Sequence, residues 1–183
     1  MKHLDGGRKG GVAAGLAALL ASLAGSGPAL ADQALIDDAL AAAAPGLAEG
    51  AKVVDWEGTV LKEGANGYTC LPTPPTLEGT APMCLDEAWM HWAMAWQHKQ
   101  PITVDALGIA YMLAGDEGAS LVDPYAQAPT GDNAWVEEGP HLMLIAPAAL
   151  LEGYSSDPHG GGPYLMWQGT DYQHLMVPVG PRD

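Results

Sequence analysis

The chain lacks phenylalanine and is poor in positive charge. Its 183 residues include 7 lysine and arginine residues against 22 aspartate and glutamate residues, which gives a formal charge of -15. A surface this negative has no route onto a phosphate backbone through counterion release, and it repels anionic lipid. Nucleic acid and anionic membranes are therefore excluded as partners. Because phenylalanine is missing, tryptophan and methionine must fill the large volumes of a core.

The sequence signatures of common enzymes are also missing. The chain has no Gly-x-Ser-x-Gly elbow, no phosphate-binding glycine loop and no His-Glu-x-x-His motif. It has no regular Asp-x-Asp-x-Asp-Gly calcium loop. The acidic pairs Asp86/Glu87 and Glu137/Glu138 are adjacent in sequence, which favours exposed surface charge over acid–base catalysis.

The N-terminus, by contrast, has the organisation of a secretory signal peptide. Lys2, Arg8 and Lys9 precede an apolar run over 12–23, which is shorter than the ~20 residues that span a bilayer. A small-x-small triplet follows and ends at Ala31, which predicts cleavage after this residue. A membrane anchor is the alternative, but the order of charge, apolar run and small residues favours Sec-type export to the periplasm or the medium.

Residues 32–183 are predicted to form one exported, soluble domain. Cleavage removes three basic residues and one acidic residue, so the formal charge falls from -15 to -17. No further apolar run of membrane length follows, so we expect no stable membrane anchor after cleavage. No linker separates two independent cores, and 48% apolar composition is sufficient for one core of ordinary size.

The two cysteines, Cys70 and Cys84, are predicted to form a disulfide. An isolated pair in an oxidising compartment is most simply a structural bridge. A redox or metal site is the alternative, but the spacing is wider than Cys-x-x-Cys. The segment between them is rich in proline and is predicted to have little secondary structure.

The pattern of apolar residues predicts an α+β fold with a mainly antiparallel sheet packed by two helices and joined by Pro/Gly-rich loops. The first helix is expected over 33–47, with Asp32 as its N-cap, and the second over 86–98, with its three tryptophans toward the core. Strands are expected over the following ranges: 52–55, 59–62, 107–113, 141–146, 164–167 and 174–179. The loops over 115–140 and 153–163 are long for a compact domain.

A recurring His-Leu-Met pattern provides the sharpest chemical hypothesis. His141 and Met143 lie in one expected strand, and His174 and Met176 lie in another. Side chains at i and i+2 project from the same face of a strand, so each histidine points with its methionine. If the two strands are neighbours in suitable register, two imidazoles and two thioethers converge. This combination of ligands suits copper, Cu(I) in particular.

Other interpretations of the same residues stay open. Tyr164-Leu165-Met166 has the same pattern without a histidine, and a methionine in a strand is commonly a core filler. In a small hydrolase, His141, His159 or His174 would act as a general base near the tryptophan-rich helix and the 153–163 loop. A structural or interaction module with no small-molecule site is the third alternative.

A second candidate cluster lies on the helix expected over 86–98. His91, Met94 and His98 follow the i, i+3, i+7 spacing and share the helix face opposite the tryptophans. This spacing allows ligands on one face, but a solvated helix face is the simpler interpretation.

Several phrases resemble those of a small group of secreted bacterial proteins with no assigned activity. They are 64–70 (Gly-Ala-Asn-Gly-Tyr-Thr-Cys), 82–86 (Pro-Met-Cys-Leu-Asp), 162–167 (Gly-Pro-Tyr-Leu-Met-Trp) and 174–179 (His-Leu-Met-Val-Pro-Val). The resemblance covers most of the chain from about residue 50 onward. It implies that these segments belong to one domain, and it implies no reaction and no catalytic residue. The sequence thus favours an exported binding protein, with a metal ion or a small ligand as its partner.

Overall fold

The computed structural model describes residues 30–182, and the segment 1–29, which holds most of the predicted signal peptide, lies outside the described residues. Within residues 30–182, no helix has the length and apolar character needed to cross a membrane.

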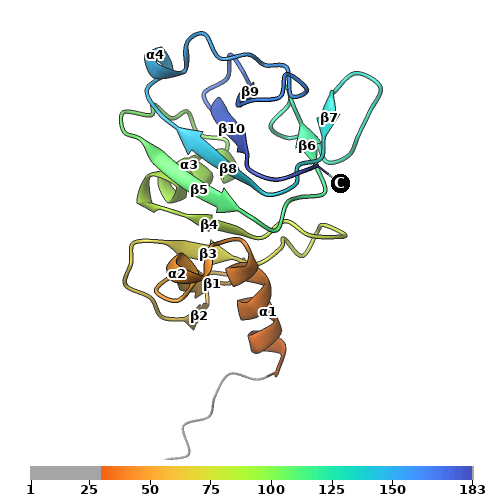
Figure 1. Ribbon diagram of the computed structural model, residues 1–183. Coiled ribbons are helices and arrows are strands. Elements are labelled where there is room, and N and C mark those ends of the chain that lie inside the picture. Colours follow the sequence, from red (N-terminus) through yellow and green to blue (C-terminus); the bar gives the residue numbers. More distant parts are fainter. Residues whose placement is uncertain (1–29, 183) are drawn as a thin grey trace, which may run out of the picture.

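In residues 30–182, an eight-stranded sheet forms the centre of the fold, with four helices around it (Figure 1). The helices are α1 (Leu30–Ala41), α2 (Pro45–Ala48), α3 (Glu87–Gln97) and α4 (Ala148–Leu151). The strands of the sheet are β1 (Lys52–Val54), β2 (Val60–Lys62), β3 (Thr69–Leu71), β4 (Met83–Leu85), β5 (Gly108–Met112), β8 (His141–Ile145), β9 (Tyr164–Met166) and β10 (His174–Pro178). A separate two-stranded sheet consists of β6 (Ala119–Ser120) and β7 (Trp135–Val136).

The strand order of the large sheet is β2-β1-β3-β4-β5-β8-β10-β9. Neighbouring strands are antiparallel, with the exception of the parallel pair β1 and β3. Sequence-distant strands lie side by side, because β8 is inserted between β5 and β10. The prediction of a single α+β domain with a mainly antiparallel sheet is confirmed.

Helix α3 forms where its apolar stripe predicts it, and the structure shows that Asp86 is its N-cap rather than its first residue. The Asp86 side chain accepts a hydrogen bond from Trp89 N and thereby satisfies one of the free N–H groups of the first turn. Its other carboxylate oxygen accepts from Ile109 N in β5, at 2.6 Å, and ties the helix to the sheet. Asp86 is therefore a structural residue rather than a free surface charge. Trp89 and Trp92 are buried against the sheet.

The first helix differs from its prediction at both ends. It begins at Leu30, so Asp32 lies inside the helix and is not its N-cap. It ends at Ala41, and Pro45 starts the separate short helix α2 in the first-turn position that proline tolerates. The expected single helix over 33–47 is thus two helices, because the proline ring prevents a continuous run of backbone hydrogen bonds.

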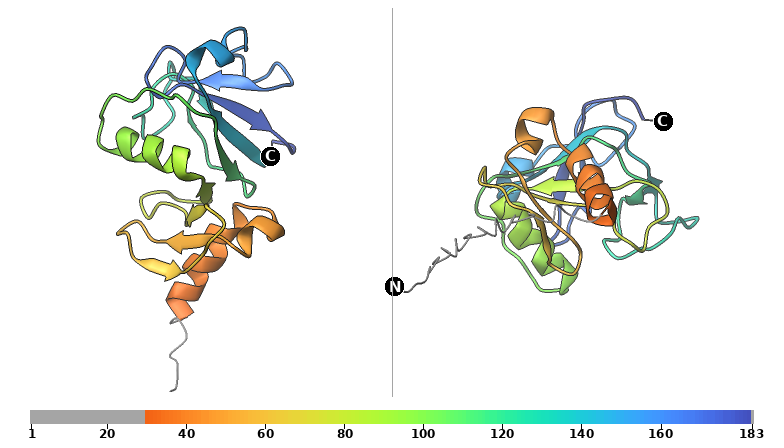
Figure 2. Two further views of the ribbon diagram at one scale, coloured as in Figure 1. Left: turned by 90° about the vertical axis from the view of Figure 1, so that its left-hand side faces the viewer. Right: turned by 90° about the horizontal axis from the view of Figure 1, so that it is seen from below.

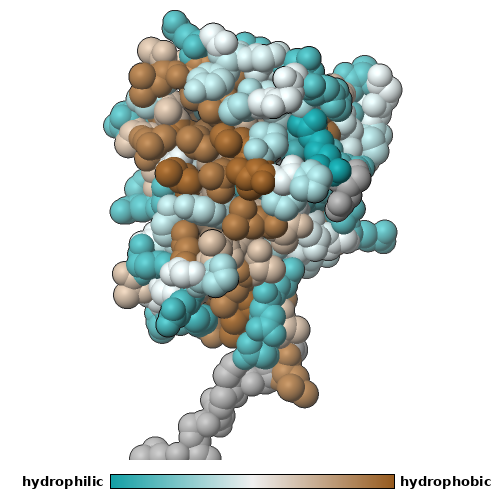
Figure 3. Space-filling model, viewed as in Figure 1, coloured by the Kyte–Doolittle hydropathy of each residue, from teal (hydrophilic) through white to brown (hydrophobic). Residues whose placement is uncertain are grey.

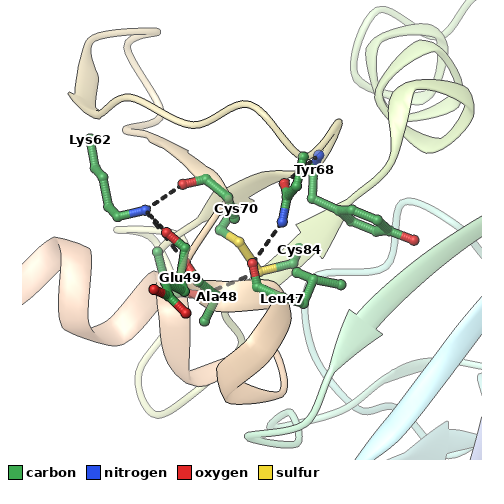
Figure 4. The surroundings of a disulfide bond; sticks show 10 residues. Leu47, Ala48, Glu49, Lys62, Tyr68, Cys70 and Cys84 are labelled. Atoms are coloured by element: carbon green, nitrogen blue, oxygen red, sulfur yellow. Dashed lines mark hydrogen bonds between the residues drawn. A yellow bond between two sulfur atoms is a disulfide. The ribbon is translucent and has the colours of Figure 1, made fainter.

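The predicted disulfide between Cys70 and Cys84 is present (Figure 4). The two residues are directly opposite each other in β3 and β4, two strands that the sequence prediction missed. Beside them, Lys62 Nζ donates to three backbone carbonyls, those of Ala48, Glu49 and Ala51. The bridge joins two inner strands, and the lysine ties the edge strand β2 to the end of α2 and the residues that follow it.

The two faces of the sheet have different coverings (Figure 2). Helix α3 packs over β4 and β5 on one face, and α1 packs over β1 to β4 on the other. The part of the second face formed by β5, β8 and β10 carries half-buried aliphatic side chains, among them Leu142, Leu144 and Val177. Figure 3, which views this side, shows a continuous hydrophobic area. The candidate site lies on the opposite face, beneath α3.

Candidate functional site

The two His-x-Met pairs lie on neighbouring strands and on the same face of the sheet. Met176 of β10 pairs with Met143 of β8, and His141 pairs with Pro178. Opposite residues of an antiparallel pair share a face, and so do residues two apart along each strand. The four candidate ligands therefore project toward α3, as the strand period predicted, while Leu142 and Leu175 project to the other side.

The register places the two thioethers together at the middle of this face. Residues directly opposite each other have Cβ atoms about 5 Å apart, so Met143 and Met176 are in contact range. The histidines lie at opposite ends of the pair. His174 is four residues before Pro178, so its Cα lies about 13 Å along the strand from that of His141. The structure thus centres the site on the methionines and flanks it with imidazoles.

Each flanking imidazole is held by a hydrogen bond to the backbone two residues before it. The Nδ1 atom of His141 lies 2.8 Å from Gly139 O, and that of His174 lies 3.0 Å from Tyr172 O. A carbonyl oxygen only accepts, so Nδ1 donates its proton in both rings. In metal sites, a backbone carbonyl bound to one ring nitrogen orients the histidine in the same way.

His174 is enclosed by tryptophan rings. The indoles of Trp89, Trp92 and Trp167 meet its imidazole edge-to-face, with ring centroids 5.5, 5.5 and 4.9 Å away. Burial in this apolar cage lowers the pKa of His174 from 6.5 to about 4, and a positive charge on His141 would lower the pKa further. The ring is therefore neutral at physiological pH.

The lowered pKa of His174 predicts a loss of stability in acid. The unfolded chain protonates this histidine below pH 6.5, whereas the folded chain does so only below about pH 4. The folded state therefore keeps its full stability above pH 6.5 and loses stability as the pH falls toward 4. We expect the loss to amount to about 3 kcal/mol of unfolding free energy. Denaturant unfolding between these pH values measures it.

The control is His174→Phe, which fills the cage with an apolar ring. Its unfolding free energy should fall less steeply with acid than that of the wild type. Asp116→Asn is introduced into both proteins. Burial raises the pKa of the Asp116 carboxyl, so its protonation in acid would stabilise the fold and offset part of the loss caused by His174. Parallel curves for wild type and His174→Phe would contradict the prediction.

A buried polar cluster lies at the other end of the site, next to His141. The Glu138 side chain is 3% exposed. Its Oε1 atom accepts hydrogen bonds from Tyr164 Oη at 2.6 Å and from Arg182 Nε at 2.9 Å. This carboxylate raises the pKa of Arg182, and burial together with the same carboxylate raises the pKa of Tyr164. Glu138 is therefore a buried anion neutralised by a residue 44 positions away in the chain.

Two buried polar atoms of this cluster have no hydrogen-bond partner. They are Nε2 of His141 and Oε2 of Glu138. His141 is fully buried, and its Nε2 lies 3.8 Å from Asp116 Oδ2, which is too far for a hydrogen bond. Native structures rarely leave such buried atoms unsatisfied, so these two atoms are unusual positions in the cluster.

Sequence reasoning missed most of this cluster. Glu138 was expected to be exposed beside Glu137, and that expectation is wrong, because Arg182 and Tyr164 compensate its charge in the interior. Neither partner is local in sequence, so no spacing rule finds them. The only local hint of this cluster is that Glu137 and Glu138 come shortly before the strand that begins with His141.

The second candidate cluster lies on the protein surface. His91, Met94 and His98 are exposed on α3, on the side away from the buried tryptophans. The two histidines are seven residues apart, which is about 10 Å along a helix. His91 contributes instead to a surface groove of about 740 Å³, lined also by Tyr68, Asp86 and residues 102–107.

Two further polar side chains bear on the hydrolase alternative, His159 and Ser120. His159 is exposed, and its Nδ1 lies 3.3 Å from Arg182 Nη1. The Ser120 hydroxyl donates to Asn133 O and accepts from the backbone N–H groups of Val122 and Asp123. These contacts are those of a turn-stabilising serine rather than a nucleophile.

Comparison with known proteins finds no match: no family model, no curated protein and no solved structure corresponds to the chain. Among the residues that the structure describes, no group of three or more His, Cys, Asp or Glu side chains could hold a metal ion.

Proposed function

We propose that the protein is an exported, non-catalytic binding protein that holds one Cu(I) ion between the thioethers of Met143 and Met176. The flanking imidazoles of His141 and His174 supply nitrogen ligands from the two ends. The observation that supports this proposal best is the register, which sets the two methionines opposite each other on the helix-covered face. Cu(I) is a soft ion that favours thioether and imidazole ligands.

The state of the histidines is consistent with this proposal. Both rings have their proton on Nδ1, so Nε2 is the free nitrogen. Burial keeps His174 neutral, and thioethers have no proton to lose, so binding should depend little on pH near neutrality. The deficit of positive charge also favours the approach of a cation.

The hydrolase alternative receives less support from the geometry. His141 and His174 are 0% and 2% exposed, so neither ring faces a substrate from solvent. The groove beside α3 and the groove over 122–133 contain neither ring. A general base requires contact with the proton that it removes, and these rings are covered.

Competition with a chromophoric Cu(I) chelator under anaerobic conditions tests the proposal. Purified protein is expected to remove one equivalent of Cu(I), and His141→Ala/His174→Ala is expected to lower the affinity at least tenfold through the loss of both nitrogen ligands. The matched control is His91→Ala/His98→Ala, which removes two exposed histidines and should leave the affinity unchanged. Circular dichroism confirms that each variant is folded. Equal affinity in the wild type and the buried-histidine variant would overturn the proposal.

A further inference from the structure

The groove beside α3 is separate from the methionine site and has a volume of about 740 Å³. It is lined by the first residues of α3, by the turn at 66–68 and by the segment 102–107. Its apolar lining includes the half-buried side chains of Ile102 and Val104 and the buried Ile145. Ligand pockets typically have volumes of ~300–1,000 Å³ and combine an apolar lining with a few polar groups. The groove therefore has the size and the composition of a binding site.

The segment 102–107 has the pattern of a β-strand but no strand partner. Half-buried and exposed residues alternate at its start: Ile102 and Val104 pack against the core, whereas Thr103 and Asp105 are exposed. A period of two is that of an extended chain. In the part of the chain that the structure describes, however, no backbone N–H or C=O group of the first five residues of this segment forms a hydrogen bond. The segment is thus an extended chain whose backbone groups are unpaired.

An unpaired extended segment at a groove is suited to pairing with another chain. Exposed strand edges are templates for an added strand, and several classes of peptide-binding domain use them in this way. In such complexes the backbone hydrogen bonds provide affinity, and the side chains that contact the groove provide specificity. At ~3.3 Å per residue, the segment 102–107 can pair with about six residues of a partner.

The charge of the groove defines the partner further. Its lining includes the carboxylates of Asp86, Glu87 and Asp105 and, among the described residues, no lysine or arginine. Asp86 and Glu87 also stand at the N-terminus of α3, where they offset the helix dipole that would otherwise favour an anion. Burial, together with the nearby Tyr111 and Asp86, raises the pKa of Tyr68 to about 12, so this phenol stays neutral in the groove. The groove is therefore complementary to a basic partner.

We propose that the groove binds an extended segment of a partner protein in which basic residues alternate with apolar residues. Opposite residues of paired strands share a face. The apolar residues of the partner thus lie beside Ile102 and Val104, and its basic residues lie on the side of Asp105. A second copy of this acidic chain has the wrong charge for the site. The inference does not depend on copper binding.

Fluorescence anisotropy with a labelled, capped hexapeptide of alternating lysine and valine tests the inference in the metal-free protein. We expect it to bind at least tenfold more tightly than a hexapeptide of alternating glutamate and valine. Two further peptides are N-methylated at all lysines or at all valines. Each lacks the N–H donors of one strand edge, so one of them should lose at least tenfold in affinity and the other should not. Equal affinity of the two methylated peptides would overturn the proposed pairing.

Two charge-matched double variants separate the groove from the general attraction of an acidic protein for a basic peptide. Glu87→Gln/Asp105→Asn removes two exposed carboxylates of the groove and should weaken binding of the lysine–valine peptide at least fivefold. Glu137→Gln/Asp171→Asn removes two exposed carboxylates outside it and should leave the affinity unchanged. Circular dichroism confirms that both variants are folded. An equal loss of affinity in both would show that the peptide binds without regard to the groove, and the inference would be wrong.

Amide hydrogen exchange, measured by nuclear magnetic resonance, tests the backbone pairing directly. The amides of 102–106 should exchange rapidly in the free protein, because they form no hydrogen bond. With the lysine–valine peptide at saturation, alternate amides of this segment should exchange at least tenfold more slowly. The amide of Gly162, in an exposed loop outside the groove, should not change. Peptide binding without protection of any amide in 102–106 would overturn the inference and leave the copper proposal unaffected.

Discussion

Replacement of Arg182 by leucine is expected to lower the free energy of unfolding by about 3–5 kcal/mol. The guanidinium bonds Glu138 through Nε and Nη2, and the carboxylate is almost completely buried. Without Arg182, the folded protein must either hold an uncompensated charge in its interior or protonate Glu138. Both outcomes cost free energy, and the cost of protonation increases with pH. Urea unfolding of the wild type and Arg182→Leu at neutral pH measures the difference.

Glu138→Gln in the Arg182→Leu background tests the reason for this loss. The neutral amide removes the buried charge, so the double variant should recover a large part of the lost stability. Glu137→Gln is the matched control, because this neighbouring glutamate is exposed, and its replacement should change stability by less than about 0.5 kcal/mol. If the changes in unfolding free energy caused by Arg182→Leu and Glu138→Gln simply add in the double variant, the two residues are not a coupled buried pair, which would contradict this account.

The variant Met143→Leu/Met176→Leu is expected to bind Cu(I) at least about a hundredfold more weakly than the wild type, which corresponds to about 2.7 kcal/mol. The variant lacks both thioethers, and its two candidate imidazoles stay at opposite ends of the strand pair, with leucine side chains between them. Leucine has nearly the volume of methionine, so the loss of stability should stay below about 1.5 kcal/mol per position. The affinity and the fold can therefore be measured separately.

Met83→Leu/Met90→Leu is the matched control for this comparison. Both residues are half-buried methionines packed against the same hydrophobic cluster as Met143. If copper bound to methionine without regard to position, the two double variants would lose affinity equally. A loss confined to Met143 and Met176 is the expected outcome.

The sequence was sufficient for the features that depend on local pattern. The tryptophan period predicted α3, and the alternation along 141–146 and 174–179 placed each histidine on the same face as its methionine. The pairing of the two cysteines also followed from composition and compartment.

Features that depend on contacts between distant segments were not predictable. Strand order decides that β8 and β10 are neighbours and that Met143, rather than His141, is opposite Met176. The strands β3 and β4 were hidden by their length of three residues and by the proline-rich segment between them. The burial of Glu138 depends on Arg182, and nothing near either residue indicates the pair.

Copper K-edge X-ray absorption of the Cu(I)-loaded protein tests the central claim most directly. Both cysteines of the chain form the disulfide, so any sulfur bound to copper comes from methionine. The account predicts two sulfur neighbours together with nitrogen neighbours, and it predicts that the sulfur scattering disappears in Met143→Leu/Met176→Leu. A first shell of nitrogen and oxygen alone, the same in both proteins, would contradict it.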